Sequence, residues 1–292
     1  YGAGASFLSV NGSTCCILAT ISALCKPGDE ILIARNCHKA VYNACFLNRL
    51  QVHYVEAEFD PTTGFYTRVT QAALDEALAA HPEVVAVVVT SPTYEGYISR
   101  LHCSVPLVVD AAHGAHLGLA PWLPGRMEGD AVICSYHKTL PALTQTAGVQ
   151  VYDSSLAPKI KRYMDMYETS SPSYVLMNSV AKMADLVADP AAFETLQAGL
   201  LKLYKLPLEH LRLIQADDPT KINISTLHCN IDGNALAHRL RACGIEPEMS
   251  DRIHVICMAT VGDTAAGFDL LARALREIDC TLEPGDWPVA PL

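Results

Sequence analysis

The stretch Asp130-Ala-Val-Ile-Cys-Ser-Tyr-His-Lys-Thr139 decides the fold class of this 292-residue chain. Its first half has the length and the Val/Ile bias of a buried strand, and it runs directly into Ser135, His137 and Lys138. A lysine at the end of a buried strand loses hydration, which depresses its pKa toward that of a nucleophilic amine. The alternative is a lysine whose amine simply reaches solvent.

Similar strand-like runs alternate with helical patterns through the first half of the chain. Several are apolar on both faces, as expected for a parallel sheet that helices cover on both sides. The expected strands are residues 30–34, 52–56, 84–90, 106–110, 130–135 and 148–152, and the expected helices are residues 13–25, 38–48 and 70–81. This alternation predicts an α/β fold, a three-layer domain around a mainly parallel sheet, over residues 1–155.

The pattern changes in the second half of the chain. Three helical stretches without a strand between them, at residues 157–168, 174–187 and 191–203, predict a helical connection over residues 156–215. A smaller α+β domain is expected over residues 216–282, with strands at 221–226 and 253–258 and helices at 233–243 and 264–278. Residues 283–292 are rich in Pro and Gly and read as a tail or linker.

Composition excludes several classes of function. Half of the residues are apolar and 18% are charged, which is typical of a globular chain. The net charge of −10 and the lack of a basic block argue against a nucleic-acid partner. The longest apolar run, residues 84–89, is too short to span a membrane, so no membrane partner is expected.

The cysteines and the first residues bear on the compartment. Eleven cysteines lie scattered through apolar segments without the spacing of a disulfide framework, so we expect reduced thiols and a cytoplasmic protein. The chain opens on Tyr1 with no signal-peptide pattern, and we expect it to be a fragment of a longer protein.

Two further features carry chemistry. Val10-Asn-Gly-Ser-Thr14 precedes a predicted helix, where Gly12 permits a turn and the free N–H groups form a site for an anion such as phosphate. An ordinary Ser or Thr cap is the alternative. Asp110 ends an apolar strand, which is where open α/β sheets hold ligands, although a turn or capping aspartate is also compatible with the sequence.

His113 and His116 are spaced i, i+3, which is compatible with a pair of metal ligands. The nearby supply of further ligands is limited to His102 and Cys103, so no metal is predicted here.

A phosphate cradle, a strand-end carboxylate and a strand-end lysine together suit pyridoxal phosphate, which has a phosphate, a ring nitrogen and an aldehyde. Several stretches also resemble the Orn/Lys/Arg decarboxylase family of fold-type I pyridoxal-phosphate enzymes. They are Val-Asn-Gly-Ser-Thr (10–14), Arg-Asn-Cys-His-Lys (35–39), Thr-Ser-Pro-Thr-Tyr (90–94), Val-Asp-Ala-Ala-His-Gly-Ala-His (109–116), Ser-Tyr-His-Lys-Thr-Leu-Pro-Ala-Leu-Thr-Gln (135–145), Ser-Ser-Pro-Ser-Tyr (170–174) and Asp-Pro-Thr-Lys (218–221).

The resemblance implies a role for each candidate site residue. Lys138 would form the Schiff base with the cofactor, Asp110 would pair with the pyridinium nitrogen, and His38 would stack on the ring. The other cofactor-binding residues would be Gly12, Ser13, Thr14, Ser135 and His137 at the phosphate, Ala112 on the second ring face, and His113 near the ring hydroxyl. His38, Ser135 and His137 also have ordinary alternatives as surface or strand-end residues.

The activity implied is decarboxylation of lysine, arginine or ornithine, releasing CO2 and the amine, in amino-acid metabolism and polyamine biosynthesis. The resemblance implies a homodimer or higher homo-oligomer in which residues 170–174 reach the partner's site. Lys138 or His38 would return a proton to the substrate. Glu246, Glu248 and Asp251 either meet the distal amine of the substrate or form a solvated acidic face.

The sequence departs from the family pattern in several places. Asp-Ala-Ala-His (110–113) stands where the family has Asp-Glu-Ala-His, residues 93–105 leave no room for a crossover helix, and residues 188–217 are abbreviated. Segments before and after the chain are missing relative to the family. Two alternatives therefore stay open: another fold-type I enzyme, such as an aminotransferase or lyase, or a catalytically silent homologue that binds a full-length decarboxylase.

Overall fold

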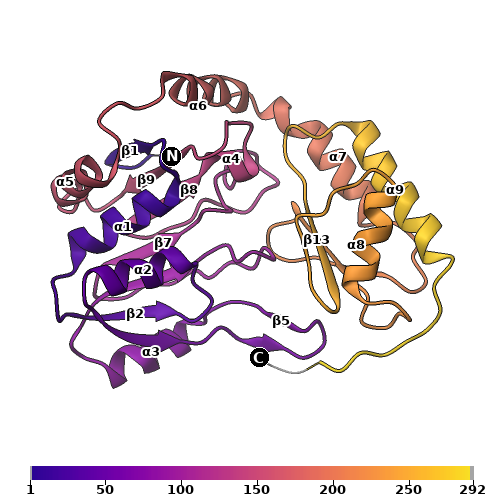
Figure 1. Cartoon of the computed structure of the whole chain (residues 1–292), viewed down its shortest axis with the longest axis horizontal. Helices are drawn as coiled ribbons and strands as arrows, with labels where there is room; N and C mark the ends of the chain where they lie inside the picture. The colour runs from indigo at the N-terminus through magenta and orange to yellow at the C-terminus, as the bar shows by residue number, and fades with distance from the viewer. Residues whose placement is uncertain (1, 290–292) are drawn as a thin grey trace.

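A seven-stranded sheet forms the centre of the larger lobe in the computed structural model, which describes residues 2–289 (Figure 1). The strand order is β1-β9-β8-β7-β6-β2-β3. The strands are β1 (Ala5–Ser9), β2 (Glu30–Ala34), β3 (Gln51–Val55), β6 (Val84–Thr90), β7 (Leu107–Asp110), β8 (Ala131–Ser135) and β9 (Ala147–Val151). Neighbours from β8 to β3 are parallel, while β9 is antiparallel to β8 and β1. The predicted mainly parallel α/β sheet is confirmed, and β1 is an addition.

Helices lie on both faces of this sheet. Helix α1 (Gly12–Leu24) packs beside α2 (Lys39–Leu47) and α5 (Ala157–Tyr167), while α3 (Gln71–Ala80) packs on β3. The connections through α1 and α2 run toward the β3 edge, whereas the connection through α3 runs back to β6. Right-handed crossovers therefore put α3 on the opposite face from α1 and α2.

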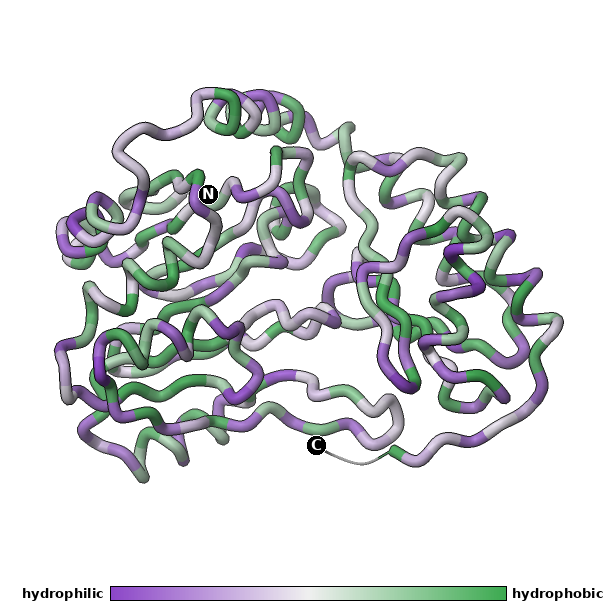
Figure 2. Tube along the Cα trace, viewed as in Figure 1, coloured by the Kyte–Doolittle hydropathy of each residue, from purple (hydrophilic) through white to green (hydrophobic). Residues whose placement is uncertain are grey.

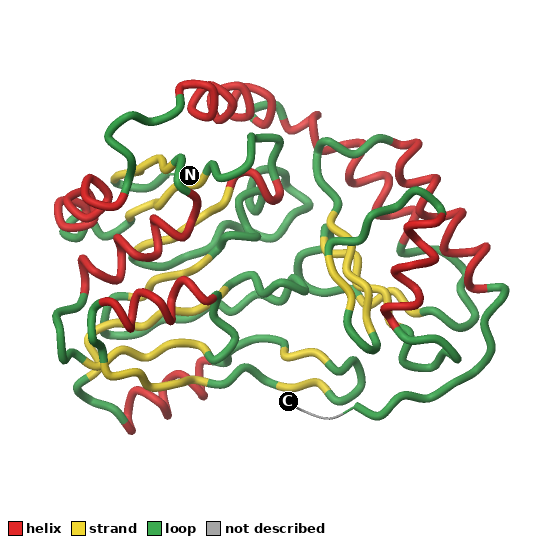
Figure 3. The backbone as a smooth tube through the Cα atoms, viewed as in Figure 1, coloured by secondary structure: helices red, strands yellow, loops and turns green. Residues whose placement is uncertain are grey.

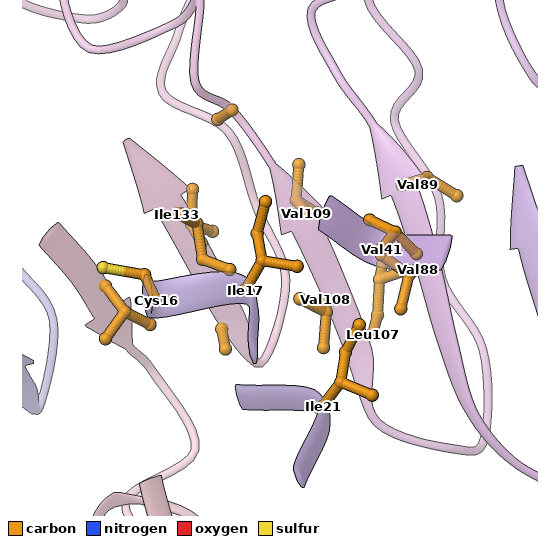
Figure 4. Close-up of a cluster of buried hydrophobic side chains, with 14 of the residues drawn as sticks. Cys16, Ile17, Ile21, Val41, Val88, Val89, Leu107, Val108, Val109 and Ile133 are labelled. Atoms are coloured by element: carbon orange, nitrogen blue, oxygen red, sulfur yellow. The ribbon is translucent and has the colours of Figure 1, made fainter. Parts of the chain in front are cut away.

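The core of the larger lobe forms between α1, α2 and the central strands. Cys16, Ile17 and Ile21 of α1 meet the apolar side chains of β7 and β8 (Figure 4). The central strands run as mostly hydrophobic segments through the lobe (Figure 2). Burial of both sheet faces explains why these strands read as continuous apolar runs.

The link between β6 and β7 is irregular, as the short segment predicts. Residues 91–106 contain no helix or strand and bend toward the smaller lobe. Ile98 N–H donates to the Asp217 carboxylate (2.8 Å), and Asp218 N–H donates to the Gly96 carbonyl (2.9 Å). This link therefore forms part of the junction between the lobes.

A four-stranded antiparallel sheet with order β10-β11-β13-β12 forms the smaller lobe, which confirms the predicted α+β unit. Its elements are β10 (Arg212–Ile214), β11 (Lys221–Ser225), α8 (Gly233–Ala242), β12 (Met249–Ser250), β13 (His254–Met258) and α9 (Ala265–Asp279). The lobe is reached through α6 (Tyr174–Val187), a 3-10 helix (Pro190–Phe193) and α7 (Glu194–Leu203). Helix α7, expected in the connection, packs on α9 because Leu196, Leu200 and Leu203 form one apolar stripe.

Two smaller segments complete the described chain. A hairpin of β4 (Phe59–Asp60) and β5 (Phe65–Tyr66) reaches from β3 toward the smaller lobe (Figure 3). Residues 283–289, expected to be part of a linker, lie along the smaller lobe, where Trp287 Nε1 donates to the Cys229 carbonyl (2.9 Å). Residues 290–292 of that tail fall outside the described part. Among residues 2–289, no helix is both long and apolar enough to cross a membrane.

Candidate active site

A cavity of about 530 Å³ lies between the carboxyl ends of the central strands and the smaller lobe. Six of the ten predicted site residues line it: Ser13, His38, Asp110, Ala112, His113 and Lys138. Its other lining residues are Asn36, Gly64, Phe65, Tyr66, Thr90, Thr93, Tyr94, Glu95, Glu248 and Asp251. The remaining predicted residues, Gly12, Thr14, Ser135 and His137, lie around the cavity without lining it.

Asp110 and Lys138 lie at the carboxyl ends of neighbouring strands, one in the strand and one in the turn that follows. Asp110 is the last residue of β7 and is buried, and Lys138 lies in α4 (Tyr136–Thr139), the single turn that follows β8. Burial raises the pKa of Asp110 to about 6, although the Ala112 N–H (3.2 Å) and the charge of Lys138 oppose this shift. Burial lowers the pKa of Lys138. The two groups thus form a buried carboxyl with a raised pKa and an amine with a lowered pKa at the carboxyl ends of the central strands.

His113 connects this pair to the rest of the site. Its Nε2 lies 2.8 Å from Lys138 Nζ, and its ring makes an edge contact with Tyr94 at 4.7 Å. Burial and then the charge of Lys138 lower the pKa of His113 to about 2, so the ring is neutral. Its buried Nδ1 has no hydrogen-bond partner within the described chain.

His38 is the cap residue of α2. Its Nδ1 accepts a hydrogen bond from Ala40 N–H (3.2 Å), which orients the ring. Burial, followed by the charge of Lys138, lowers the pKa of His38. A neutral, oriented imidazole in the cavity is compatible with the stacking role that the resemblance implies.

The start of α1 is joined to the loop after α4. Gly12 adopts φ +79°, which few other residues tolerate, and its N–H donates to the Gln145 carbonyl (2.8 Å). The Gln145 side chain in turn donates to the Val10 carbonyl (2.8 Å). Asn11 makes no side-chain cap, so the first turn of α1 keeps donors for an anion near Ser13.

These residues fit pyridoxal phosphate. The buried hydroxyl of Ser135 has no partner among the described residues, as expected for a group that awaits an external acceptor. His137 Nδ1 is bonded to the Thr146 carbonyl (2.8 Å), which fixes the ring beside the same turn. An uncapped helix start, a hydroxyl without a partner, a buried carboxylate and an amine match the cofactor's phosphate, ring nitrogen and aldehyde. We call this set, centred on Asp110, His113 and Lys138, the cofactor wall.

The part of the cavity lining that comes from residues 91–106 and from the smaller lobe is rich in carboxylates, and we call Tyr94, Glu95, Glu248 and Asp251 the acidic wall. Tyr94 Oη donates to Glu248 (2.5 Å), which connects the link after β6 to the smaller lobe. Burial raises the pKa of Glu95. Glu246 lies outside the cavity lining and pairs with Arg241 (2.8 Å).

Sequence reasoning assigned no role to Tyr94 or Glu95. Tyr94 belongs to a family-like stretch, which was the available signal. Their place in the cavity depends on the path of residues 91–106, which no local pattern reveals.

A buried polar cluster contacts the backbone of His113. Asp218 accepts hydrogen bonds from His116 Nε2 (3.1 Å) and Thr220, and lies 3.5 Å from Lys221 Nζ. Lys221 Nζ also donates to the His113 carbonyl (3.4 Å). The two histidines weighed as a metal pair thus contact Lys138 and Asp218 instead.

The fold and the site together define a fold-type I pyridoxal-phosphate protein. Among solved structures, the constitutive lysine decarboxylase of Escherichia coli superimposes with a TM-score of 0.81 at 20% identity, over 96% of this chain and 50% of that one. At that identity the likeness shows the fold, and it also shows that this chain spans about half of the solved protein.

Sequence comparison narrows the class. The sequence-family model for the major domain of Orn/Lys/Arg decarboxylases matches residues 1–201. The arginine decarboxylase of Halalkalibacterium halodurans is 32% identical over 307 residues, covering 95% of this chain and 62% of that protein. The arginine decarboxylase of Bacillus cereus is 30% identical over 308 residues, covering 96% and 67%. The chain therefore belongs to the Orn/Lys/Arg decarboxylase family, and pyridoxal phosphate is its expected cofactor.

Proposed function

We propose that this chain catalyses the pyridoxal-phosphate-dependent decarboxylation of a basic amino acid, namely arginine, lysine or ornithine, and releases CO2 and the corresponding amine. The observation that carries the proposal is the cavity itself. Its lining brings together the buried carboxylate of Asp110, the amine of Lys138 and the three carboxylates of the acidic wall. The relatives named arginine decarboxylase support the same conclusion.

The cofactor wall supplies the binding groups. Lys138 would hold the cofactor covalently, and Asp110 would pair with its ring nitrogen. Gly12, Ser13, Thr14, Ser135 and His137 would hold the phosphate, His38 and Ala112 the two ring faces, and His113 the ring hydroxyl. When bound, pyridoxal phosphate supplies the electron sink for the breaking bond to the carboxylate.

The protein's own groups then act on charge and protons. Asp110 sits in a low-dielectric environment, where a fixed negative charge stabilises a neighbouring positive charge more strongly than in water. Burial lowers the pKa of the Lys138 amine, which contacts the neutral ring of His113, and a lysine with a lowered pKa accepts and returns a proton more readily. Lys138 or His38, which both line the cavity, returns the proton to the α-carbon of the substrate.

The acidic wall selects the substrate. Glu95, Glu248 and Asp251 face the same cavity as Lys138, so an amino acid held near Lys138 presents its side chain toward these carboxylates. A distal ammonium or guanidinium is attracted there, whereas a neutral side chain gains nothing.

We also propose that the active form is a homodimer and that it is located in the cytoplasm. Its amine product would enter polyamine biosynthesis. Tyr174 and Val175 begin α6 with side chains that are 80% and 70% exposed, which is an unusual position for large apolar residues. Eleven free thiols fit a reducing compartment. The substitution Val175→Glu is expected to lower the sedimentation coefficient, and an unchanged value contradicts the proposed surface.

The experiment is an assay of the purified chain loaded with pyridoxal phosphate. We expect a visible cofactor absorbance and CO2 release from at least one of arginine, lysine and ornithine, with little from norleucine. Amine transfer to a keto acid without CO2 release would identify another fold-type I activity. A cofactor band without either reaction would identify a silent homologue and reject the proposal.

A further inference from the structure

Three side chains with metal-ligating atoms lie close together away from the cavity, near the amino-terminal ends of strands in the large sheet. Glu30 is the first residue of β2, His53 lies in β3, and His81 follows α3. One ligand atom from each lies within 4.8 Å of the others. His53 Nε2 is 2.9 Å from Glu30 Oε2, and the two imidazole rings stack at 3.6 Å with 20° between their planes.

The fold brings these residues together for a clear reason. In the parallel pairing of β2 and β3, Glu30 faces Gln51 and Leu32 faces His53. Because side chains alternate along a strand, Glu30 and His53 point to the same face of the sheet. Helix α3 packs on β3, and the chain leaves the helix at His81, whose N–H donates to the Ala77 carbonyl (3.1 Å).

The donor set is that of a zinc site. Two imidazole nitrogens and one carboxylate oxygen are a common three-ligand set for Zn²⁺, with water in the fourth position. Bonds of about 2.0–2.1 Å at a tetrahedral angle separate two ligand atoms by about 3.3 Å. The His53 and Glu30 atoms therefore need to separate by less than half an ångström. The His81 ring has to turn out of its stack with His53, so that the lone pairs of both imidazoles aim at the same point.

The surroundings also favour a cation. All three residues are partly exposed, so an ion has a path to them. His81 lies at the C-terminal end of α3, where the helix dipole is negative. In Figure 1, α3 lies at the lower left, on the side of the large lobe away from the smaller lobe.

We propose that Glu30, His53 and His81 bind a zinc-type divalent cation that ties together β2, β3 and the end of α3. Without the ion, the His53 and Glu30 side chains share a hydrogen bond. With the ion, His53 releases the Nε2 proton and both side chains become ligands. The site is distinct from the decarboxylase cavity and does not depend on the proposed function.

The test uses the cofactor-loaded protein after treatment with a chelator. Zn²⁺ is titrated in competition with a chromophoric chelator, and Co²⁺ is added separately to record visible d–d bands. We expect one Zn²⁺ per chain bound and tetrahedral-type Co²⁺ bands. The variants His81→Gln and Glu30→Gln are each expected to weaken Zn²⁺ affinity at least about tenfold, because even outer-shell changes cost that much.

The matched control is His238→Gln, which removes an exposed histidine from α8 in the other lobe and is expected to leave the Zn²⁺ affinity unchanged. Circular dichroism verifies that each variant is folded. X-ray absorption of the Zn²⁺ complex counts the imidazole ligands, and two are expected, so the proposal stays testable if one variant misfolds. Wild-type protein without a bound Zn²⁺, or variants that retain full affinity, would overturn the site.

Discussion

The two walls of the cavity rest on different kinds of structure. In the cofactor wall, Asp110 ends β7 and Lys138 lies in the single turn after β8, and the side chains of both strands are buried in the main core. The acidic wall is carried by the irregular link of residues 91–106 and by short segments of the smaller lobe. The packed sheet fixes the chemistry shared by a whole fold class, while loops carry what distinguishes one substrate from another.

The largest expected effect is at the cofactor wall. Lys138→Ala removes the amine that would hold the cofactor and exchange protons, so we expect decarboxylation to fall about 10³-fold or more. The shift of cofactor absorbance that marks covalent attachment is expected to disappear as well. Retention of that shift in the variant would show that another residue holds the cofactor.

The next largest effect is expected at the junction between the two lobes. Asp218 and Lys221 are fully buried, and Lys221 also supports the His113 carbonyl. The substitution Asp218→Ala leaves a buried ammonium without its partner, and we expect the free energy of unfolding to fall by about 3–5 kcal/mol. Chemical denaturation of the cofactor-free protein measures this change.

Two variants control that measurement. Asp269→Asn breaks an exposed ion pair with Lys202 and is expected to cost less than about 1 kcal/mol. Combining Asp218→Ala with Lys221→Met removes both charges and is expected to recover part of the loss. Equal losses in the buried and the exposed single variants would contradict the role of the junction.

Asp110→Asn is expected to separate activity from stability. Loss of the charge that would pair with the ring nitrogen is expected to lower turnover about 10²–10³-fold. In the cofactor-free protein the same change is expected to stabilise the fold at neutral pH, because burial raises the pKa of Asp110 from 3.8 to about 6. Because the pKa of this carboxyl is higher in the folded state, the fold becomes less stable as the pH rises from 3.8 to about 6.

The pH dependence of the free energy of unfolding gives the sign and the size of this stabilisation. Below about pH 3 Asp110 is mostly protonated in both the folded and the unfolded state, so wild type and variant differ little on this account. Between about pH 3 and about pH 7 the wild type loses up to about 3 kcal/mol relative to the variant, at 1.36 kcal/mol for each pKa unit. Denaturation midpoints at both pH values check this, and a gap that does not change with pH would contradict it.

The same contrast explains which features are predictable from the sequence. The strands around Asp110 and Lys138 read as continuous apolar runs because helices cover both faces, and strand-end polar residues stand out against them. Strand β1 lacks that signature, since its first four residues alternate between partly exposed and exposed at the sheet edge and its one buried residue, Ser9, is polar. The two-residue strands β4, β5 and β12 are too short for any periodic signal.

The acidic wall was only partly visible in the sequence for a related reason. Glu246, Glu248 and Asp251 lie close together in the chain, and the sequence does not distinguish a solvated face from a binding wall. The structure separates them: Glu248 and Asp251 line the cavity, while Glu246 pairs with Arg241. Which carboxylate faces the cavity depends on how the smaller lobe sits against residues 91–106, and this is set by long-range contacts such as Tyr94 with Glu248.

The smallest expected effect, and the sharpest test of the acidic wall, is at Glu248. Glu248→Gln keeps the size of the side chain and removes its charge, so we expect KM for the basic substrate to rise about tenfold with little change in kcat. Glu246→Gln is the matched control and is expected to leave KM unchanged, because Glu246 does not line the cavity. Michaelis curves for both variants at one ionic strength make the comparison. Equal changes in the two variants would mean that the net charge of the smaller lobe attracts the substrate, whereas a change confined to Glu248 places the distal cation at the wall.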